Sequence, residues 1–158
     1  MASYWHLHPL RVRYQETDQM AVVYHANYVN WFEIGRTEFI RHAGMSYRDI
    51  ELAGLLLPVT ELAASFERPA RYDERLAICT RIGEFSKFRL RFESQIRRIA
   101  EEQELPNIVP EDHDLPGERL VSGGTKHVWL NREWRPARLD RLAPELYRLL
   151  GRLAEASE

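Results

Sequence analysis

The strongest constraint on the fold is a two-residue alternation of apolar and polar side chains over residues 88–97. Successive side chains of a strand point to opposite faces, so this pattern predicts a strand with one buried and one solvated face. Strands of this kind are typical of antiparallel sheets. The apolar set is Phe88, Leu90, Phe92 and Ile96, and the polar set is Arg89, Arg91, Glu93, Gln95 and Arg97.

Four weaker patterns predict the other strands of the sheet. Residues 10–14 alternate as a first strand, and residues 58–67 and 76–82 follow after a helical region. A last strand is expected over residues 119–131. Ser86 and Lys87 predict a tight turn before the strand at 88–97.

The region between the first two strands has helical periodicity. Asn27 is the expected N-cap, and Gly44 the expected residue just past the C-terminus. Between them we predict an amphipathic helix of about four turns. Its apolar positions are Tyr28, Phe32, Gly35, Phe39 and Ala43.

A second, short helix is predicted immediately afterwards. Ser46 and Asp49 have the spacing of a capping box, and Met45 and Ile50 that of a hydrophobic staple. Gly54 is expected to end this helix.

Two further segments complete the chain. Residues 100–117 are acidic and rich in proline, which predicts a surface loop or a hairpin insertion. Leucines at helical spacing predict a C-terminal helix over residues 140–158, beginning near Pro144. With these segments, residues 1–158 are expected to form a single α+β domain, an antiparallel sheet of about five strands with one long helix on one face.

Composition excludes several classes of protein. The formal net charge of −2 is not that of a nucleic-acid binder. Nowhere do 18 apolar residues follow one another, so no membrane insertion is expected. A single cysteine, Cys79, rules out an intrachain disulfide and favours a reducing, cytoplasmic setting, and we expect it to be a small buried hydrophobe. His6 and His8 lack a third ligand at useful spacing, so no metal site is predicted.

One carboxylate is placed for chemistry. Asp18 lies in a loop, and the chain enters the long helix about seven residues later, around residues 25–27. A helix N-terminus presents unpaired N–H groups and a partial positive charge, which can stabilise an oxyanion. A carboxylate nearby can attack a carbonyl or activate water. An aspartate after a strand can equally be a turn residue.

The stretch T-D-x-x-x-V-V-Y-H-A-N-Y-x-x-W-F-E-x-x-R-T-E at Thr17–Glu38 resembles the entry motif of hotdog-fold thioesterases. The 4-hydroxybenzoyl-CoA thioesterase-like family is the most similar group, especially its branch of acyl-CoA thioesterases that includes Tol–Pal-associated proteins. F-E-R-P-A-R-Y-D-E at Phe66–Glu74 and R-P-A-R at Arg135–Arg138 are similar to later motifs of that family. The resemblance covers residues 8–140.

The resemblance implies an acyl-CoA thioesterase of the hotdog fold, in which the sheet wraps around the central helix. Asp18 falls on the family's catalytic aspartate, as nucleophile or general base, and His25 on the residue whose N–H polarises the thioester carbonyl. No cofactor is implied, because CoA is part of the substrate. The expected assembly is a homodimer or homotetramer with the site at a subunit interface. Substrate contacts are expected from Tyr24, Asn27, Tyr28, Arg71, Lys87 and Arg89, of which the last three suit the CoA phosphates.

Alternatives remain open at this point. Glu33 on the helix is the second candidate for the catalytic carboxylate, although it can also pair with Arg36 three residues on. The enzyme can act on acyl carrier protein, or the chain can be a non-catalytic acyl-CoA-binding protein. Ala21 stands where the family commonly has glycine, a residue that often serves positive φ or close backbone approach.

Overall fold

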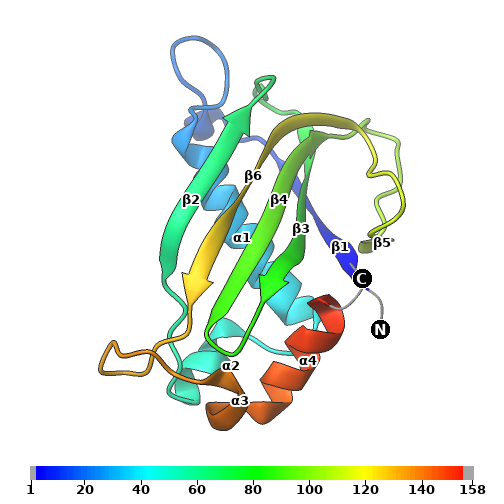
Figure 1. The fold of residues 1–158 in the computed structure, drawn as a ribbon. Coiled ribbons are helices and arrows are strands. Elements are labelled where there is room, and N and C mark those ends of the chain that lie inside the picture. Colours follow the sequence, from blue (N-terminus) through cyan, green and yellow to red (C-terminus); the bar gives the residue numbers. More distant parts are fainter. Residues whose placement is uncertain (1–2, 155–158) are drawn as a thin grey trace.

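An antiparallel sheet of six strands wraps around one long helix in the computed structural model, which describes residues 3–154 (Figure 1). The strands follow the order β2-β6-β4-β3-β1-β5 across the sheet. They comprise β1 (Tyr4–Arg11), β2 (Val59–Phe66), β3 (Arg75–Phe85), β4 (Arg89–Arg98), β5 (Ile108–Pro110) and β6 (Glu118–Val128).

The long helix α1 (Ala26–His42) lies against one face of the sheet, which we call the inner face. The predicted hotdog fold is thereby confirmed. Packing on this face is aromatic: the Phe39 ring meets Phe92 of β4 at 6.0 Å and Tyr4 of β1 at 5.7 Å between centroids. The smaller helices are η1 (Tyr14–Glu16), α2 (Tyr47–Leu52), α3 (Leu139–Leu142) and α4 (Pro144–Ala154).

The first strand differs from its predicted position at residues 10–14. β1 ends at Arg11, and Tyr14 lies in η1 with 77% of its surface exposed. The alternation begins earlier and includes a buried histidine, His6, whose ring lies 5.0 Å from that of His42 on α1. Because His6 is polar, the apolar alternation in the sequence did not reveal that the strand begins before residue 10.

The segment 100–117 is more ordered than a surface loop. It contains β5, a sixth strand that pairs with β1 at the sheet edge. Its Val109 packs over Trp5 and Cys79 on the outer face of the sheet. Cys79 is fully buried and free, as predicted.

Most helix boundaries agree with their sequence signals. The Ser46 hydroxyl accepts from Asp49 N–H at 3.1 Å and the Asp49 carboxylate from Ser46 N–H at 3.3 Å, so the predicted capping box is confirmed. Gly44 has a φ of 105°, a conformation that glycine adopts without strain. Asn27 is not the N-cap of α1: the cap is His25, two residues earlier.

The C-terminal helix begins at Pro144, where it was predicted, but α3 precedes it. Leu146, Leu150 and Leu153 are buried, whereas Leu142 is exposed. The predicted helix extended to residue 158, and residues 155–158 lie outside the described part. Within residues 3–154, no helix has both the length and the apolar character required to cross a bilayer.

One close approach sets the position of α1 on the sheet. Gly35 faces β3, and a Cβ atom on it would lie 2.4 Å from Thr80 Oγ1 and 2.6 Å from Ile78 Cγ2. Both distances are shorter than a non-bonded contact allows. Thr80 and Ile78 are fully buried and β-branched, so neither can rotate away easily.

Gly35→Ala should therefore lower the free energy of unfolding by about 1–3 kcal/mol, the usual range for an overpacked core. Urea denaturation measures the change. Gly151→Ala on α4 is the matched control, because its Cβ would meet only Phe85 at 3.7 Å. That variant should gain about 0.5–1 kcal/mol from helix propensity. Equal stability of Gly35→Ala and wild type would show that α1 can move off the sheet freely.

Candidate active site

A short hairpin carries Asp18 in front of α1. Asp18 N–H donates to Val22 O at 2.9 Å, and Ala21 N–H donates to Asp18 O at 3.0 Å. The Asp18 side chain is itself held, since its Oδ1 accepts from Met20 N–H at 2.8 Å. The carboxylate thus closes an Asx turn through one oxygen, and no other hydrogen bond to it is formed within residues 3–154.

Ala21 is the last of the three loop residues of this hairpin, and it has a φ of +64°. The hydrogen-bond pattern is that of a three-residue hairpin loop, whose last residue is normally a left-handed glycine. Positive φ is therefore the physical reason for the glycine that the family commonly has there. Alanine holds the same turn with strain.

The N-terminus of α1 lies next to this hairpin. His25 is the N-cap with helical dihedrals, and its C=O accepts from Tyr28 N–H at 3.2 Å. In the described part of the chain, the N–H groups of His25 and Ala26 donate to no protein acceptor. The free N–H at His25, expected from the resemblance, is thus available to a ligand oxygen.

A buried glutamate, which the sequence analysis missed, holds the hairpin against the helix. Glu16 is 6% exposed, and its Oε2 accepts from Trp31 Nε1 on α1 at 2.9 Å. Its Oε1 accepts from Arg13 N–H at 2.8 Å. Its backbone C=O accepts from the Asn27 side chain at 2.8 Å. The only sequence signal was a glutamate two residues before Asp18.

A cavity of about 240 Å³ lies between the Asp18 hairpin, the N-terminus of α1 and the end of β2. Phe66 of β2 forms an aromatic wall, with its ring 5.6 Å from Tyr28 and 6.2 Å from His25. Figure 1 shows the tip of β2 at the same end of the molecule as the blue segment before α1. The lining residues are Asp18, Met20, Val22, Val23, His25, Tyr28, Phe66, Glu67, Arg68 and Pro69.

Of the predicted substrate contacts, only Tyr28 lines this cavity together with Asp18 and His25. Its hydroxyl accepts from Ala70 N–H at 3.0 Å, which fixes the ring. Tyr24 is 48% exposed and packs beside His25 outside the cavity. The Asn27 side chain instead donates a hydrogen bond to the backbone oxygen of Glu16.

The predicted phosphate-binding cations are divided between the two ends of the protein. Arg71 is exposed just after Ala70, near the cavity, although Arg68 is the cation that lines it. Lys87 and Arg89 lie at the turn between β3 and β4. Along β6, the partners of Phe66 and Arg89 are seven residues apart, which corresponds to about 23 Å. A single protomer does not bring Lys87 and Arg89 to the Asp18 cavity.

Glu33, the second candidate carboxylate, is exposed on α1 and lines a different cavity. Its expected ion pair with Arg36 does not form: no nitrogen of Arg36 lies within ion-pair distance of a carboxylate in residues 3–154. Glu33 therefore lacks both the hairpin and the free helix N-terminus that accompany Asp18.

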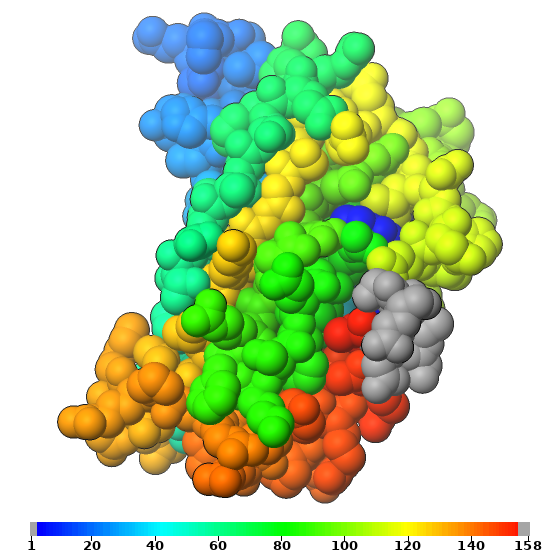
Figure 2. Space-filling view, in the orientation of Figure 1, coloured from blue at the N-terminus to red at the C-terminus, as the bar shows by residue number. Residues whose placement is uncertain are grey.

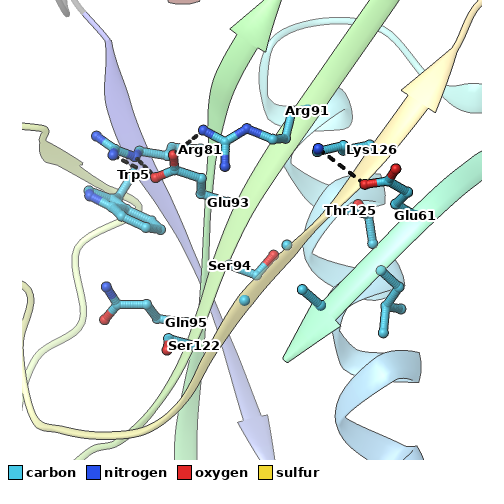
Figure 3. Close-up of a pocket in the computed structure, with 14 residues that line it drawn as sticks. Trp5, Glu61, Arg81, Arg91, Glu93, Ser94, Gln95, Ser122, Thr125 and Lys126 are labelled. Atoms are coloured by element: carbon cyan, nitrogen blue, oxygen red, sulfur yellow. Dashed lines mark hydrogen bonds and ion pairs between the residues drawn. The ribbon is translucent and has the colours of Figure 1, made fainter. Parts of the chain in front are cut away.

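A larger cavity, about 420 Å³, is on the outer face of the sheet (Figure 3). Figure 2 shows this face, with the blue of β1 visible at the floor of a hollow. Its charged side chains neutralise one another: Arg81 pairs with Glu93 at 2.5 Å, and Lys126 with Glu61 at 3.1 Å. No helix N-terminus opens into it. It therefore lacks the helix N–H groups that could stabilise an oxyanion.

The Asp18 cavity has the two elements needed for attack on an acyl carbonyl. A carboxylate with one free oxygen can act as nucleophile or base. Unpaired N–H groups at the positive end of a 17-residue helix can stabilise the oxyanion that forms.

Several known proteins are similar to this chain. Residues 12–142 match the family described as the thioesterase-like superfamily. The acyl-CoA thioester hydrolase YbgC of Escherichia coli is 39% identical over 74 residues, 47% of this chain and 55% of YbgC. The acyl-acyl carrier protein thioesterase ATL2 of Arabidopsis thaliana is 35% identical over 130 residues, 82% of this chain and 61% of ATL2. The chain thus spans little more than half the length of the curated relatives it matches.

A solved structure supports the same relationship over nearly the whole chain. The DHNA-CoA thioesterase of Staphylococcus aureus superposes with a TM-score of 0.80 at 29% identity. The superposition covers 94% of this chain and 90% of that enzyme.

Ala21→Gly should raise the free energy of unfolding by about 0.5–1 kcal/mol. The relief of left-handed strain exceeds the entropy that glycine adds to the unfolded chain. Urea denaturation at pH 7 measures the change, with Ala26→Gly at the exposed start of α1 as a control that should lose stability. A loss of stability in Ala21→Gly would contradict the strained turn.

Proposed function

The chain belongs to the thioesterase-like superfamily, and from this premise we propose that it hydrolyses acyl-CoA thioesters to a carboxylate and free CoA. The observation that carries the proposal is a shared cavity: Asp18 and His25, whose N–H has no protein acceptor among residues 3–154, both line a space of about 240 Å³. A thioester carbonyl placed there meets a nucleophile or base and an oxyanion site together.

Two routes fit this arrangement. In the first, Asp18 attacks the carbonyl carbon, the C–S bond breaks with release of the CoA thiolate, and water hydrolyses the resulting anhydride. In the second, Asp18 takes a proton from water as the water oxygen attacks, and the proton passes to the leaving sulfur. Both routes place negative charge on the carbonyl oxygen, where the His25 N–H donates. Neither route requires a cofactor.

The cations near the cavity suit the phosphates of CoA. Arg68 lines the cavity, and Arg71 is three residues further along the exposed loop after β2. Arginine binds phosphate through two parallel N–H bonds. Lys87 and Arg89, at the other end of the sheet, would reach this substrate only from a second copy.

We also propose a homodimer or homotetramer. β2 is an edge strand, so one row of its backbone groups has no neighbouring strand among residues 3–154. Its inner-face side chains Val59, Leu62 and Phe66 are 45%, 44% and 53% exposed. A second copy along this edge would cover them and close the open side of the Asp18 cavity.

An acyl-carrier-protein substrate is the second candidate, and the similarity to ATL2 favours it. A non-catalytic acyl-CoA-binding role is the third, and the placement of Asp18 argues against it, because binding alone requires no carboxylate beside a thioester. We also propose a cytoplasmic location, which a sequence with the single cysteine Cys79 favours. Membership of the Tol–Pal-associated branch stays a prediction.

Asp18→Asn should lower kcat for acyl-CoA hydrolysis by about 10²–10⁴-fold with a small change in KM, because it removes the attacking or proton-accepting group and keeps the shape. Thiol release from acyl-CoA esters of varied length measures the rate.

Glu33→Gln is the matched control and should stay within a few-fold of wild type, as Glu33 lies outside the Asp18 cavity. Undiminished hydrolysis by Asp18→Asn would overturn the assignment. Turnover of acyl carrier protein esters, without turnover of any CoA ester, would favour the second candidate.

A further inference from the structure

A second cavity of about 260 Å³ lies further along α1 and is not used by the proposed chemistry. Figure 1 shows α2, the beginning of β2 and the end of β6 together, at the end of the molecule away from the Asp18 hairpin. The cavity lies among these elements and α1. It is lined by Glu33, Arg36, Thr37, Tyr47, Glu51, Leu57 and His127.

Arg36 is the distinctive member of this lining. It is only 9% exposed, and on the same helix Arg41 pairs with Glu38, whereas no carboxylate of residues 3–154 pairs with Arg36. A guanidinium is always charged, and burying it without an anion is strongly unfavourable. The guanidinium is therefore available to an anion that enters the cavity.

Two polar groups stand beside Arg36. Burial raises the pKa of the Tyr47 hydroxyl, and the charge and hydrogen bonding of Arg36 offset part of that rise, so Tyr47 Oη lies beside the guanidinium although their contact lacks full hydrogen-bond geometry. His127 is 2% exposed and has a pKa lowered to about 4, chiefly by burial and also by Arg36. Its Nδ1 donates to Leu57 O at 3.2 Å, so the neutral ring accepts at Nε2 from the Thr125 hydroxyl at 2.8 Å.

The two ring nitrogens of His127 are thus both satisfied inside the protein. The Tyr47 hydroxyl and the Arg36 guanidinium are the donors that remain for a ligand. A carboxylate can accept from both groups and neutralise the guanidinium.

The cavity is aligned with the Asp18 site. Arg36 follows His25 by 11 residues, close to three helical turns, so both lie on one stripe of α1, about 16 Å apart. Between them the inner face of β2 presents Leu62 and Phe66, which are opposite Thr125 and Val121 of β6. Phe66 lines the Asp18 cavity, and Leu57, just before β2, lines the Arg36 cavity. By strand register, the apolar side chains of Leu62 and Phe66 thus lie on the face of β2 between the two cavities.

We propose that the Arg36 cavity binds a carboxylate at the far end of the acyl group, so that the substrates of this site are ω-carboxylated acyl-CoA thioesters. The inference rests on the proposed function and adds its substrate class. The thioester lies at the N-terminus of α1, the methylene chain follows these apolar side chains of β2, and Arg36 and Tyr47 hold the distal carboxylate. Glu33 and Glu51 also line the cavity, but both are exposed, so solvent weakens their repulsion of the bound carboxylate.

The test compares kcat/KM for straight-chain acyl-CoA esters with that for ω-carboxyacyl-CoA esters of equal length. Wild type should prefer the carboxylated ester roughly ten- to a hundredfold at the lengths that span about 16 Å, and not at shorter lengths. Arg36→Met should abolish this ratio, and Tyr47→Phe should reduce it. Because each ratio compares two substrates of the same variant, a general loss of activity cancels.

Arg41→Met, which removes an exposed arginine from the same helix, should keep the wild-type ratio. Calorimetric binding of ω-carboxyacyl-CoA to Asp18→Asn, with and without Arg36→Met, gives a readout independent of turnover. A ratio near one at every length, or a preference that survives Arg36→Met, would overturn the inference while leaving the thioesterase intact. A change of oligomeric state in Arg36→Met with an unchanged ratio would assign the arginine to a second copy and also overturn it. Hydrolysis of neither series would instead refute the proposed function.

Discussion

The seating of α1 on the sheet at Gly35 is the contact on which the rest of the structure depends. The helix backbone approaches Thr80 and Ile78 so closely that no Cβ atom fits between them. This contact is ten residues from the N-cap His25, about 15 Å along a rigid helix. The depth at which Gly35 sits therefore decides where the free N–H groups of the helix point.

Three local contacts then place the remaining groups around that N-terminus. The buried Glu16 carboxylate joins the hairpin to Trp31 on α1. The Tyr28 hydroxyl joins the helix to the backbone at Ala70, after β2. The Asx turn of Asp18 orients the carboxylate itself. Together these contacts hold the hairpin, the segment after β2 and the Asp18 side chain in fixed positions around the N-terminus of α1, and the cavity lies between them.

Patterns that depend on neighbours in the sequence were predicted well. The alternation at 88–97 became β4, the periodic stretch from residue 28 became α1, and Asp18 lies beside the start of that helix as its spacing suggested. Ala21 was noted only as a departure from a family pattern, and its φ of +64° supplies the physical reason.

What the sequence could not reveal depends on contacts between distant segments. β5 forms because its three residues meet the edge of β1, not because of any strong local pattern. Arg68 replaces Lys87 and Arg89 at the cavity, since only the strand register shows which loops share an end of the sheet. The isolation of Arg36 is equally invisible in sequence, where Glu33 three residues earlier suggested a pair.

The most direct measurement is a crystal structure of the Asp18→Asn variant with an acyl-CoA thioester bound. The account predicts that the thioester carbonyl oxygen accepts from the His25 N–H at about 2.7–3.1 Å, with the residue 18 side chain beside the carbonyl carbon. A thioester bound elsewhere, for instance in the hollow on the outer face of the sheet, would contradict it.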